Sequence, residues 1–167
     1  MAFLARRRVA LGFICGIAAL VLARPTRDTL LVGALIAAAG EAIRIWAAGH
    51  LEKSREVTTS GPYRFTRHPL YVGSAVITLG FVIASRSWLV ALLAAVYLAL
   101  TYTAAIRREE AFLTEQFGAA YPDYRAGRLG GVARTFSLER AMRNREYRSV
   151  GGILAAIAVL AVKMVIR

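Results

Sequence analysis

Residues 61–71 read GPYRFTRHPLY and gather reactive and rigid groups between two apolar stretches. Gly61 and Pro62 indicate a turn. Pro69 restricts the residue before it to an extended conformation and suits the first turn of a helix, where its missing N–H costs nothing. His68 is therefore predicted at a helix N-terminus, beside unpaired N–H groups. The pKa of the histidine imidazole lies close to neutral pH and is easily shifted by its surroundings, so this position favours a binding or catalytic role.

Three aromatic residues in the same stretch have a simpler explanation. Tyr63, Phe65 and Tyr71 are also typical of the aromatic belt at a membrane interface. That belt does not account for a histidine held before a proline. We therefore favour a functional role for His68, and the aromatic residues remain open to both interpretations.

A second polar stretch, residues 107–125, follows another apolar run and reads RREEAFLTEQFGAAYPDYR. Phe112 and Phe117 recur with Leu113 at helical spacing, which predicts that the preceding helix continues past the membrane surface. Gly118 is suited to end that helix. Residues 119–125 are predicted to form a loop.

The carboxylates of Glu109 and Glu110 are adjacent in this stretch. Two neighbouring carboxylates attract a cation, so they suit an ammonium or sulfonium group. They can also pair with Arg107 and Arg108 along the helix surface, which contributes only about 0.2–0.5 kcal/mol per pair. Both interpretations remain open from the sequence.

Glu41 and Arg44 lie inside an apolar stretch, where charges are costly and usually face a partner or a cavity. Their i, i+3 spacing allows them to pair with each other, and a role in lining a site is equally compatible with the pattern. Gly151 and Gly152 lie in another apolar stretch and are predicted to allow close helix packing.

Several familiar nucleotide-binding and metal-binding motifs are absent from the sequence. It contains no GxGxxG after a strand, no P-loop and no HExxH. The 2 histidines and the single cysteine are far apart, so no metal site is predicted.

The elements that must position these groups are membrane helices. The chain has 167 residues, 57% of them hydrophobic, and the apolar residues form blocks at 9–23, 30–50, 70–84, 88–106 and 150–166. A membrane-spanning helix needs about 17–25 such residues, so the two shorter blocks require tilt or local thinning of the bilayer. We predict an all-α polytopic membrane protein with about five transmembrane helices. A cleaved signal peptide is a poor alternative, because no small-residue cleavage site follows the first block.

Loop charges predict the orientation of the helices. Most of the 22 basic residues fall in segments on the same side as the N-terminus, which indicates a cytoplasmic N-terminus and contacts with anionic headgroups. Nucleic-acid binding explains these charges less well, because they are spread over three loops beside helices. Arginine outnumbers lysine heavily, which indicates a GC-rich bacterial genome and hence a bacterial inner membrane.

The two polar stretches together, GPYRFTRHPLYVG and RREEAFLTEQFGAAYPDYR separated by a helical hairpin, resemble the isoprenylcysteine carboxyl methyltransferase family and the related phospholipid N-methyltransferases. The likeness covers residues 44–125. It implies a membrane methyltransferase that uses S-adenosylmethionine in a pocket at the cytoplasmic face. The implied acceptor is lipophilic: the carboxylate of an isoprenylcysteine-like or other lipid or isoprenoid molecule, or a phospholipid amine.

The resemblance also implies roles for individual residues. The residues expected to bind the cofactor are Tyr63, His68, Leu70, Tyr71, Gly73, Glu109 and Glu110, with one of the two glutamates holding its amino group. Apart from the resemblance, the guanidinium group suits bidentate contacts that orient an acceptor carboxylate or phosphate, so the catalytic candidates are Arg64, Arg67, Arg108 and Arg125, and which of them make these contacts stays open.

The chain departs from the family pattern after Arg125. An amphipathic segment and an additional membrane helix occupy residues 126–167, within what we interpret as a single domain of residues 1–167. Two other functions remain open: an NADPH-dependent enzyme similar to membrane sterol reductases, and a non-enzymatic membrane scaffold. The expected partners are the lipid bilayer and the lipophilic acceptor, without nucleic acid or metal. The sequence predicts no particular oligomeric state.

Overall fold

The computed structural model describes residues 2–53, 55–128 and 134–166, with the side chains described from residue 11 onward. Throughout these residues the regular structure is helical, which confirms the predicted all-α class. The helices are α1 (Ala2–Leu22), α2 (Arg27–Ala48), the 3-10 helix η1 (Gly61–Arg64), α3 (Pro69–Ser85), α4 (Trp88–Phe117), α5 (Ala120–Arg125), α6 (Leu138–Arg143) and α7 (Tyr147–Ile166).

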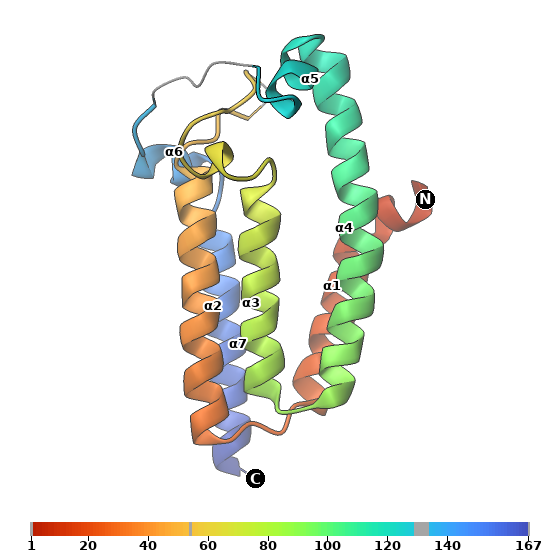
Figure 1. Cartoon of the computed structure of the whole chain (residues 1–167). Helices are drawn as coiled ribbons and strands as arrows, with labels where there is room; N and C mark the ends of the chain where they lie inside the picture. Colours follow the sequence, from red (N-terminus) through yellow and green to blue (C-terminus); the bar gives the residue numbers. More distant parts are fainter. Residues whose placement is uncertain (1, 54, 129–133, 167) are drawn as a thin grey trace.

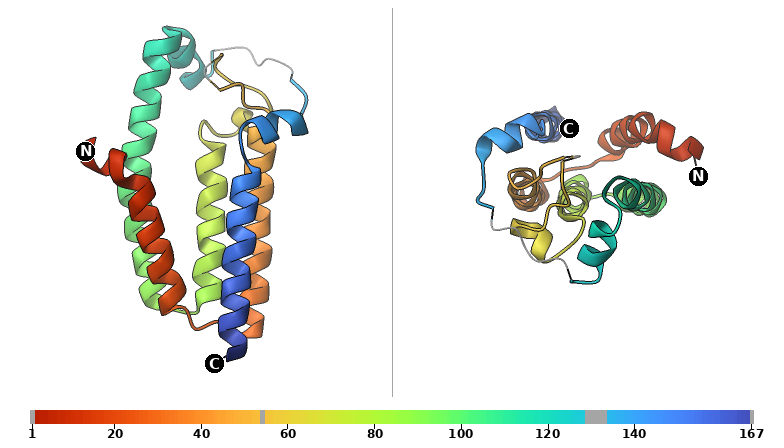
Figure 2. Two further views of the ribbon diagram at one scale, coloured as in Figure 1. Left: turned by 180° about the vertical axis from the view of Figure 1, so that it is seen from behind. Right: turned by 90° about the horizontal axis from the view of Figure 1, so that it is seen from above.

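The five long helices run alongside one another, and their connections separate the two ends of the molecule (Figure 1). Short links join α1 to α2 and α3 to α4 at one end. The polar segments η1, α5 and α6 all gather at the other end, where α4 extends beyond α2 and α3 (Figure 1). Seen from behind and from above, α7 lies against α2, and α1 lies against α4 (Figure 2). The two chemistry-bearing stretches therefore meet at one end.

The helices present apolar side chains outward. Among the described residues, three helices are long and apolar enough to cross a membrane, namely α2, α4 and α7, and two shorter apolar stretches cover Leu11–Leu22 and Pro69–Ser85. Large apolar side chains such as Phe13, Leu35 and Leu154 are largely exposed. Surface of this kind is unfavourable in water and is satisfied by lipid, as an integral membrane protein requires.

Glycines allow α2 and α3 to pack with their backbones in close approach. A Cβ added to Gly40 would lie 2.7 Å from both the carbonyl oxygen of Gly73 and the backbone nitrogen of Ile77. About two helical turns away, Gly33 and Gly80 face each other in the same way. Small residues at such a crossing let two membrane helices approach closely. This packing fixes the start of α3, and with it His68, against α2.

The glycine pair on α7 is a different case, and the predicted packing role for Gly151 and Gly152 is wrong. Both residues are exposed, and a Cβ added to either would meet nothing within 4 Å. The sequence shows only that a residue is small, whereas the rotation of the helix decides whether that residue faces a neighbour.

This contrast gives a stability prediction. Gly40→Ala is expected to lower the free energy of unfolding by about 1–2 kcal/mol, because the added methyl group meets backbone atoms that cannot move independently. Gly151→Ala, the matched control, is expected to raise it by up to about 1 kcal/mol, the difference in helix propensity. Thermal melts of both variants in one detergent would measure the difference. Equal melting temperatures would contradict the packing role of Gly40.

The helix ends in the polar stretches lie where the sequence predicted them, but two other predictions for these stretches differ from the structure. His68 is the N-cap residue of α3, Pro69 begins the helix, and Gly118 ends α4 with φ 54°. The backbone of His68 has φ −130° and ψ 56°, so it lies outside the helical region without being fully extended. Residues 119–125 were predicted as a loop, and this is wrong: Ala120–Arg125 form α5. A proline in the first turn is compatible with so short a helix.

The C-terminal region contains the predicted amphipathic segment and additional membrane helix, as α6 and α7. Residues 129–133 of that segment lie outside the described residues. α6 and the turn after it are anchored on the end of α2: the Asn144 amide donates to the carbonyls of Ala48 and Leu51 at 2.9 and 3.0 Å, and Arg140 Nε donates to the Gly49 carbonyl at 2.8 Å.

Candidate functional site

A cleft of about 880 Å³ opens at the polar end of the helices. The loop after α2 and the loop around η1 form one side of it, the start of α3 forms its base, and the end of α4 with α5 forms the opposite side. The C-terminal region completes the wall through Asn144, Glu146 and Ser149. The cleft therefore brings together segments from four separate parts of the chain.

The cleft collects most of the residues that were predicted to form a site. Those that line it are Tyr63, Arg67, His68, Leu70, Tyr71, Arg108 and Glu109. Glu110 lies at its edge and contacts His68. Arg64 and Arg125 are exposed and do not line the cleft, although Arg125 Nη1 lies 3.9 Å from a Glu110 carboxylate oxygen.

Gly73, which was also predicted to bind the cofactor, lies outside the lining of the cleft. It is buried where α3 crosses α2, and a Cβ there would lie 2.6 Å from Arg44 Cγ and 2.7 Å from the Gly40 carbonyl oxygen. The structure gives Gly73 a role in helix packing, because α2 closely approaches its open face, and cofactor binding by Gly73 stays a prediction.

The two sequence motifs meet at the Glu110 carboxylate. Its Oε1 lies 3.2 Å from His68 Nε2 and 3.5 Å from Arg67 Nη1. Burial by itself raises the pKa of Glu110, but the hydrogen bond from His68 and the nearby charges of Arg67 and Arg125 outweigh burial and hold that pKa below its ordinary value of 4.5. Glu110 is therefore an anion at neutral pH, fixed in place by groups from two other segments.

Aromatic side chains form much of the remaining wall. The rings of His68 and Tyr71 meet edge-on with centroids 5.8 Å apart, and Tyr71 meets Tyr102 of α4 at 5.1 Å. Tyr63 is buried, and burial raises the pKa of its hydroxyl. The Tyr124 hydroxyl of α5 donates to the Tyr63 carbonyl at 2.6 Å, which ties α5 to η1. Rings of this kind can bury a flat heterocycle while excluding water.

A polar network lies at the base of the cleft, and the sequence predicted only part of it. Arg44 Nη2 donates to both carboxylate oxygens of Glu146, at 2.9 and 3.0 Å, and Nη1 donates to Ser74 at 2.6 Å. The predicted pairing of Arg44 with Glu41 is present at 3.6 Å, but the Glu146 contacts are shorter. Glu41 in turn accepts a hydrogen bond from Ser149 at 2.7 Å. The sequence offered no signal for Glu146, which is 102 positions from Arg44.

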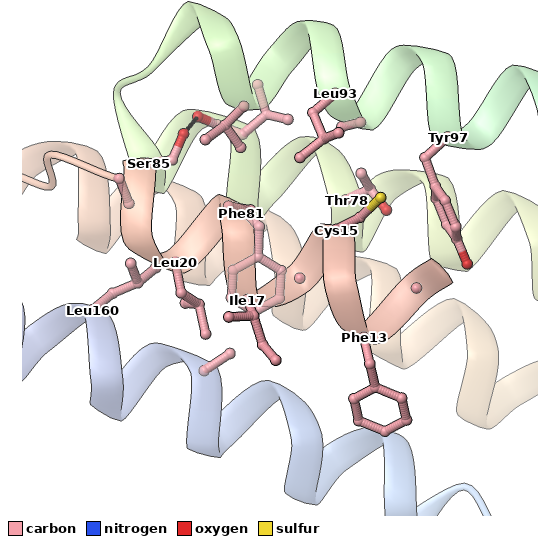
Figure 3. A pocket seen from close by; sticks show the side chains of 18 of the residues that line it. Phe13, Cys15, Ile17, Leu20, Thr78, Phe81, Ser85, Leu93, Tyr97 and Leu160 are labelled. Atoms are coloured by element: carbon pink, nitrogen blue, oxygen red, sulfur yellow. Dashed lines mark hydrogen bonds between the residues drawn. The ribbon is translucent and has the colours of Figure 1, made fainter. Parts of the chain in front are cut away.

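A second, apolar cavity of about 570 Å³ lies between α1, α3, α4 and α7. Its lining includes Phe13, Ile17 and Leu20 of α1, together with Phe81 of α3 and Leu93 of α4 (Figure 3). Its lining is almost entirely apolar. Thr78 and Tyr97 line both this cavity and the polar cleft, so the two spaces adjoin inside the helix bundle.

Among the residues that the structure describes, no group of three or more His, Cys, Asp or Glu side chains is placed so that it could hold a metal ion.

Comparison with known proteins gives one family and several curated relatives. The family described as "Phospholipid methyltransferase" matches residues 11–120. The chain is 39% identical over 83 residues to the nickel-cobalt-cadmium resistance protein NccN of Alcaligenes xylosoxydans xylosoxydans, covering 48% of this chain and 38% of the relative. It is 40% identical over 76 residues to the cobalt-zinc-cadmium resistance protein CzcN of Cupriavidus metallidurans, covering 44% and 35%.

A third relative is named as an enzyme. The chain is 31% identical over 123 residues to the protein-S-isoprenylcysteine O-methyltransferase of Schizosaccharomyces pombe, which covers 74% of this chain and 48% of the relative. The matched segments span between about a third and a half of the length of these curated relatives. No solved structure matches the chain significantly.

Proposed function

The chain belongs to the phospholipid methyltransferase family, and from this premise we propose that it transfers a methyl group from S-adenosylmethionine to a lipophilic acceptor at the cytoplasmic boundary of the membrane. The observation that carries the proposal is the contact between His68 and Glu110. It joins the two family-like motifs, 42 positions apart, at the edge of one cleft, whose wall includes His68. The metal-resistance names of two relatives describe those proteins, and no feature of the cleft favours that function here.

The residues of the cleft suit S-adenosylmethionine, which carries a zwitterionic amino-acid end, a sulfonium and an adenosine. Glu110 and Glu109 offer negative charge for the ammonium and sulfonium groups, and Arg67 offers positive charge for the carboxylate. The rings of Tyr63 and Tyr71 offer flat apolar surface for the adenine. When bound, S-adenosylmethionine supplies a methyl group that is already activated, so the protein has mainly to align the reactants and exclude water.

The apolar cavity supports a lipophilic acceptor. We propose that the acceptor enters sideways from the bilayer, places its hydrocarbon chain among residues such as Phe13 and Phe81, and extends its polar end past Thr78 and Tyr97 into the cleft (Figure 3). Arg67 and Arg108 line the cleft and can donate to an acceptor carboxylate or phosphate. A carboxylate acceptor is nucleophilic when ionised and needs no base, whereas an amine acceptor must first lose a proton.

The proposal includes an orientation of the chain in the membrane. The polar end, with η1, α5 and α6, carries most of the loop arginines, which supports a cytoplasmic location for the cleft and the N-terminus in a bacterial inner membrane. Reporter fusions in the loop before η1 and after α5 should read cytoplasmic, and a C-terminal fusion should read external. A cytoplasmic C-terminus would overturn this topology.

One ligand panel separates the classes of function. The purified protein in nanodiscs would be titrated with S-adenosylmethionine, S-adenosylhomocysteine and NADPH while its thermal stability is followed. A ligand that binds only the folded state adds about 2.7 kcal/mol at one hundred times its dissociation constant, so both adenosyl ligands should raise the melting temperature and NADPH should not. His68→Ala should lose much of that shift.

The other outcomes are equally informative. A response to NADPH alone would assign the chain to reductase-like chemistry. A folded protein that responds to none of the three ligands would be a scaffold. The acceptor itself would be identified by transfer of a radiolabelled methyl group into membrane lipid extracts and membrane proteins.

A further inference from the structure

The two tyrosines of α5 differ in how their hydroxyl groups are satisfied. Tyr124 donates to the Tyr63 carbonyl at 2.6 Å. Tyr121 is only 2% exposed and lines the cleft, yet its hydroxyl has no hydrogen-bond partner among the described residues. A buried hydroxyl without a partner is unfavourable, and most buried polar groups in proteins are hydrogen-bonded. An unpartnered one in the wall of a cleft therefore points to a ligand.

The surroundings of Tyr121 indicate which part of a ligand it faces. Burial, with the negative charges of Glu110 and Glu109, raises the pKa of Tyr121 to about 12, so the hydroxyl keeps its proton at neutral pH. Interaction of the hydroxyl with the nearby Glu110 carboxylate also contributes to this raised pKa, but the distance and angle between the two groups do not make a hydrogen bond, so the hydroxyl stays available to a ligand. The same carboxylate is flanked by Arg67. A negative group, a positive group and a free hydroxyl donor thus lie together at this side of the cleft.

That combination matches an amino-acid zwitterion, which presents an ammonium and a carboxylate on one carbon. We propose that the Tyr121 hydroxyl donates a hydrogen bond to the carboxylate of the amino-acid end of S-adenosylmethionine, while Glu110 binds its ammonium group. This inference rests on the proposed function and adds the residue that recognises the amino-acid end. Tyr121 lies inside the second family-like stretch, one position beyond residues 11–120 that match the family, and was not among the residues expected to bind the cofactor.

The geometry of α5 explains how Tyr121 is positioned. Gly118, with φ 54°, ends α4 and reverses the chain so that α5 folds back beside the end of α4 (Figure 1). The Tyr124 hydrogen bond to the Tyr63 carbonyl then holds α5 against η1. The Tyr121 and Tyr124 rings contact each other with centroids 6.2 Å apart, which further fixes the Tyr121 ring. Little rotamer freedom remains to be lost on binding, which favours affinity.

The test compares ligands with and without the amino-acid end. S-adenosylhomocysteine carries it, whereas 5′-methylthioadenosine keeps the adenosine and the sulfur and lacks it. Tyr121→Phe should bind S-adenosylhomocysteine about tenfold or more weakly than the parent, the loss of one hydrogen bond to a charged group, and should bind 5′-methylthioadenosine as the parent does. Calorimetric titration in nanodiscs measures both affinities.

The melting temperature of the variants without ligand supplies a second test. Without ligand, Tyr121→Phe should melt at or above the temperature of the parent, because it removes an unsatisfied buried hydroxyl. Tyr124→Phe is the matched control: it loses the hydrogen bond to Tyr63 and should melt lower, with the ratio of the two ligand affinities unchanged.

Each remaining outcome counts against the inference. Unchanged binding of S-adenosylhomocysteine by Tyr121→Phe would show that the hydroxyl does not touch the amino-acid end. An equal loss for both ligands would assign Tyr121 to the adenosine side or to the structure of the cleft. A parent protein that binds neither ligand would instead overturn the proposed function itself.

Discussion

Glu110→Gln is expected to bind S-adenosylmethionine roughly 10 to 100 times more weakly than the parent chain, since a hydrogen bond to a charged group is worth about 1.5–3 kcal/mol. The substitution keeps the shape of the side chain and removes its negative charge. It also leaves His68 and Arg67, at 3.2 and 3.5 Å, without the anion that holds them in place. Calorimetric titration of the purified variants would measure the loss.

Two neighbouring glutamates serve as comparisons for this prediction. Glu115→Gln makes the same change of charge on an exposed part of α4 outside the cleft and should bind like the parent. Glu109→Gln should have an effect smaller than that of Glu110→Gln, because His68 and Arg67 contact Glu110. A larger loss in Glu109→Gln would transfer the ammonium-binding role to that residue.

The pH dependence of affinity follows from the same group. The pKa of Glu110 in the folded protein lies below its ordinary value of 4.5, so its carboxylate contributes to affinity above that lower value and loses the contribution as the pH falls through it. Affinity for S-adenosylhomocysteine should therefore persist at pH 5 and decline under more acidic conditions. Glu110→Gln should lack this part of the decline.

The second large effect is expected at the base of the cleft. Glu146→Ala should lower the free energy of unfolding by about 3 kcal/mol, because it leaves the largely buried Arg44 charge without the carboxylate nearest to it. Glu146 is 7% exposed and holds Arg44 at 2.9 and 3.0 Å, joining α7 to α2. Unfolding in mixed micelles would measure the loss.

An exposed ion pair of similar length provides the control. Arg128 and Asp123 lie 2.8 Å apart at the surface, so Asp123→Ala should cost no more than about 1 kcal/mol. Replacing both Arg44 and Glu146 by leucine should recover part of the stability lost in Glu146→Ala, because both charges of that pair are removed, while Glu41 loses its contact with Arg44 at 3.6 Å. Equal costs for Glu146→Ala and Asp123→Ala would show that the buried pair does not anchor α7.

Much of the architecture follows from local features of the sequence. The apolar blocks predicted the membrane helices, because the length and composition of a helix in lipid depend on its own residues. Pro69 and Gly118 predicted where α3 begins and α4 ends, because proline and glycine act through the backbone at their own positions. The order and spacing of the two polar motifs also sufficed to indicate the family.

Tertiary structure decided what each side chain touches. Arg44 pairs most closely with Glu146 and not with Glu41, and Gly73 meets α2 instead of the cleft. The close packing of α2 on α3 sets the rotation of both helices, and rotation determines which residues face a neighbour, a cavity or lipid. Tyr121 depends on the fold in the same way, since it became part of the cleft only when the chain reversed after α4. Contacts between residues far apart in the chain depend on how whole helices pack, and no local pattern in the sequence contains that information.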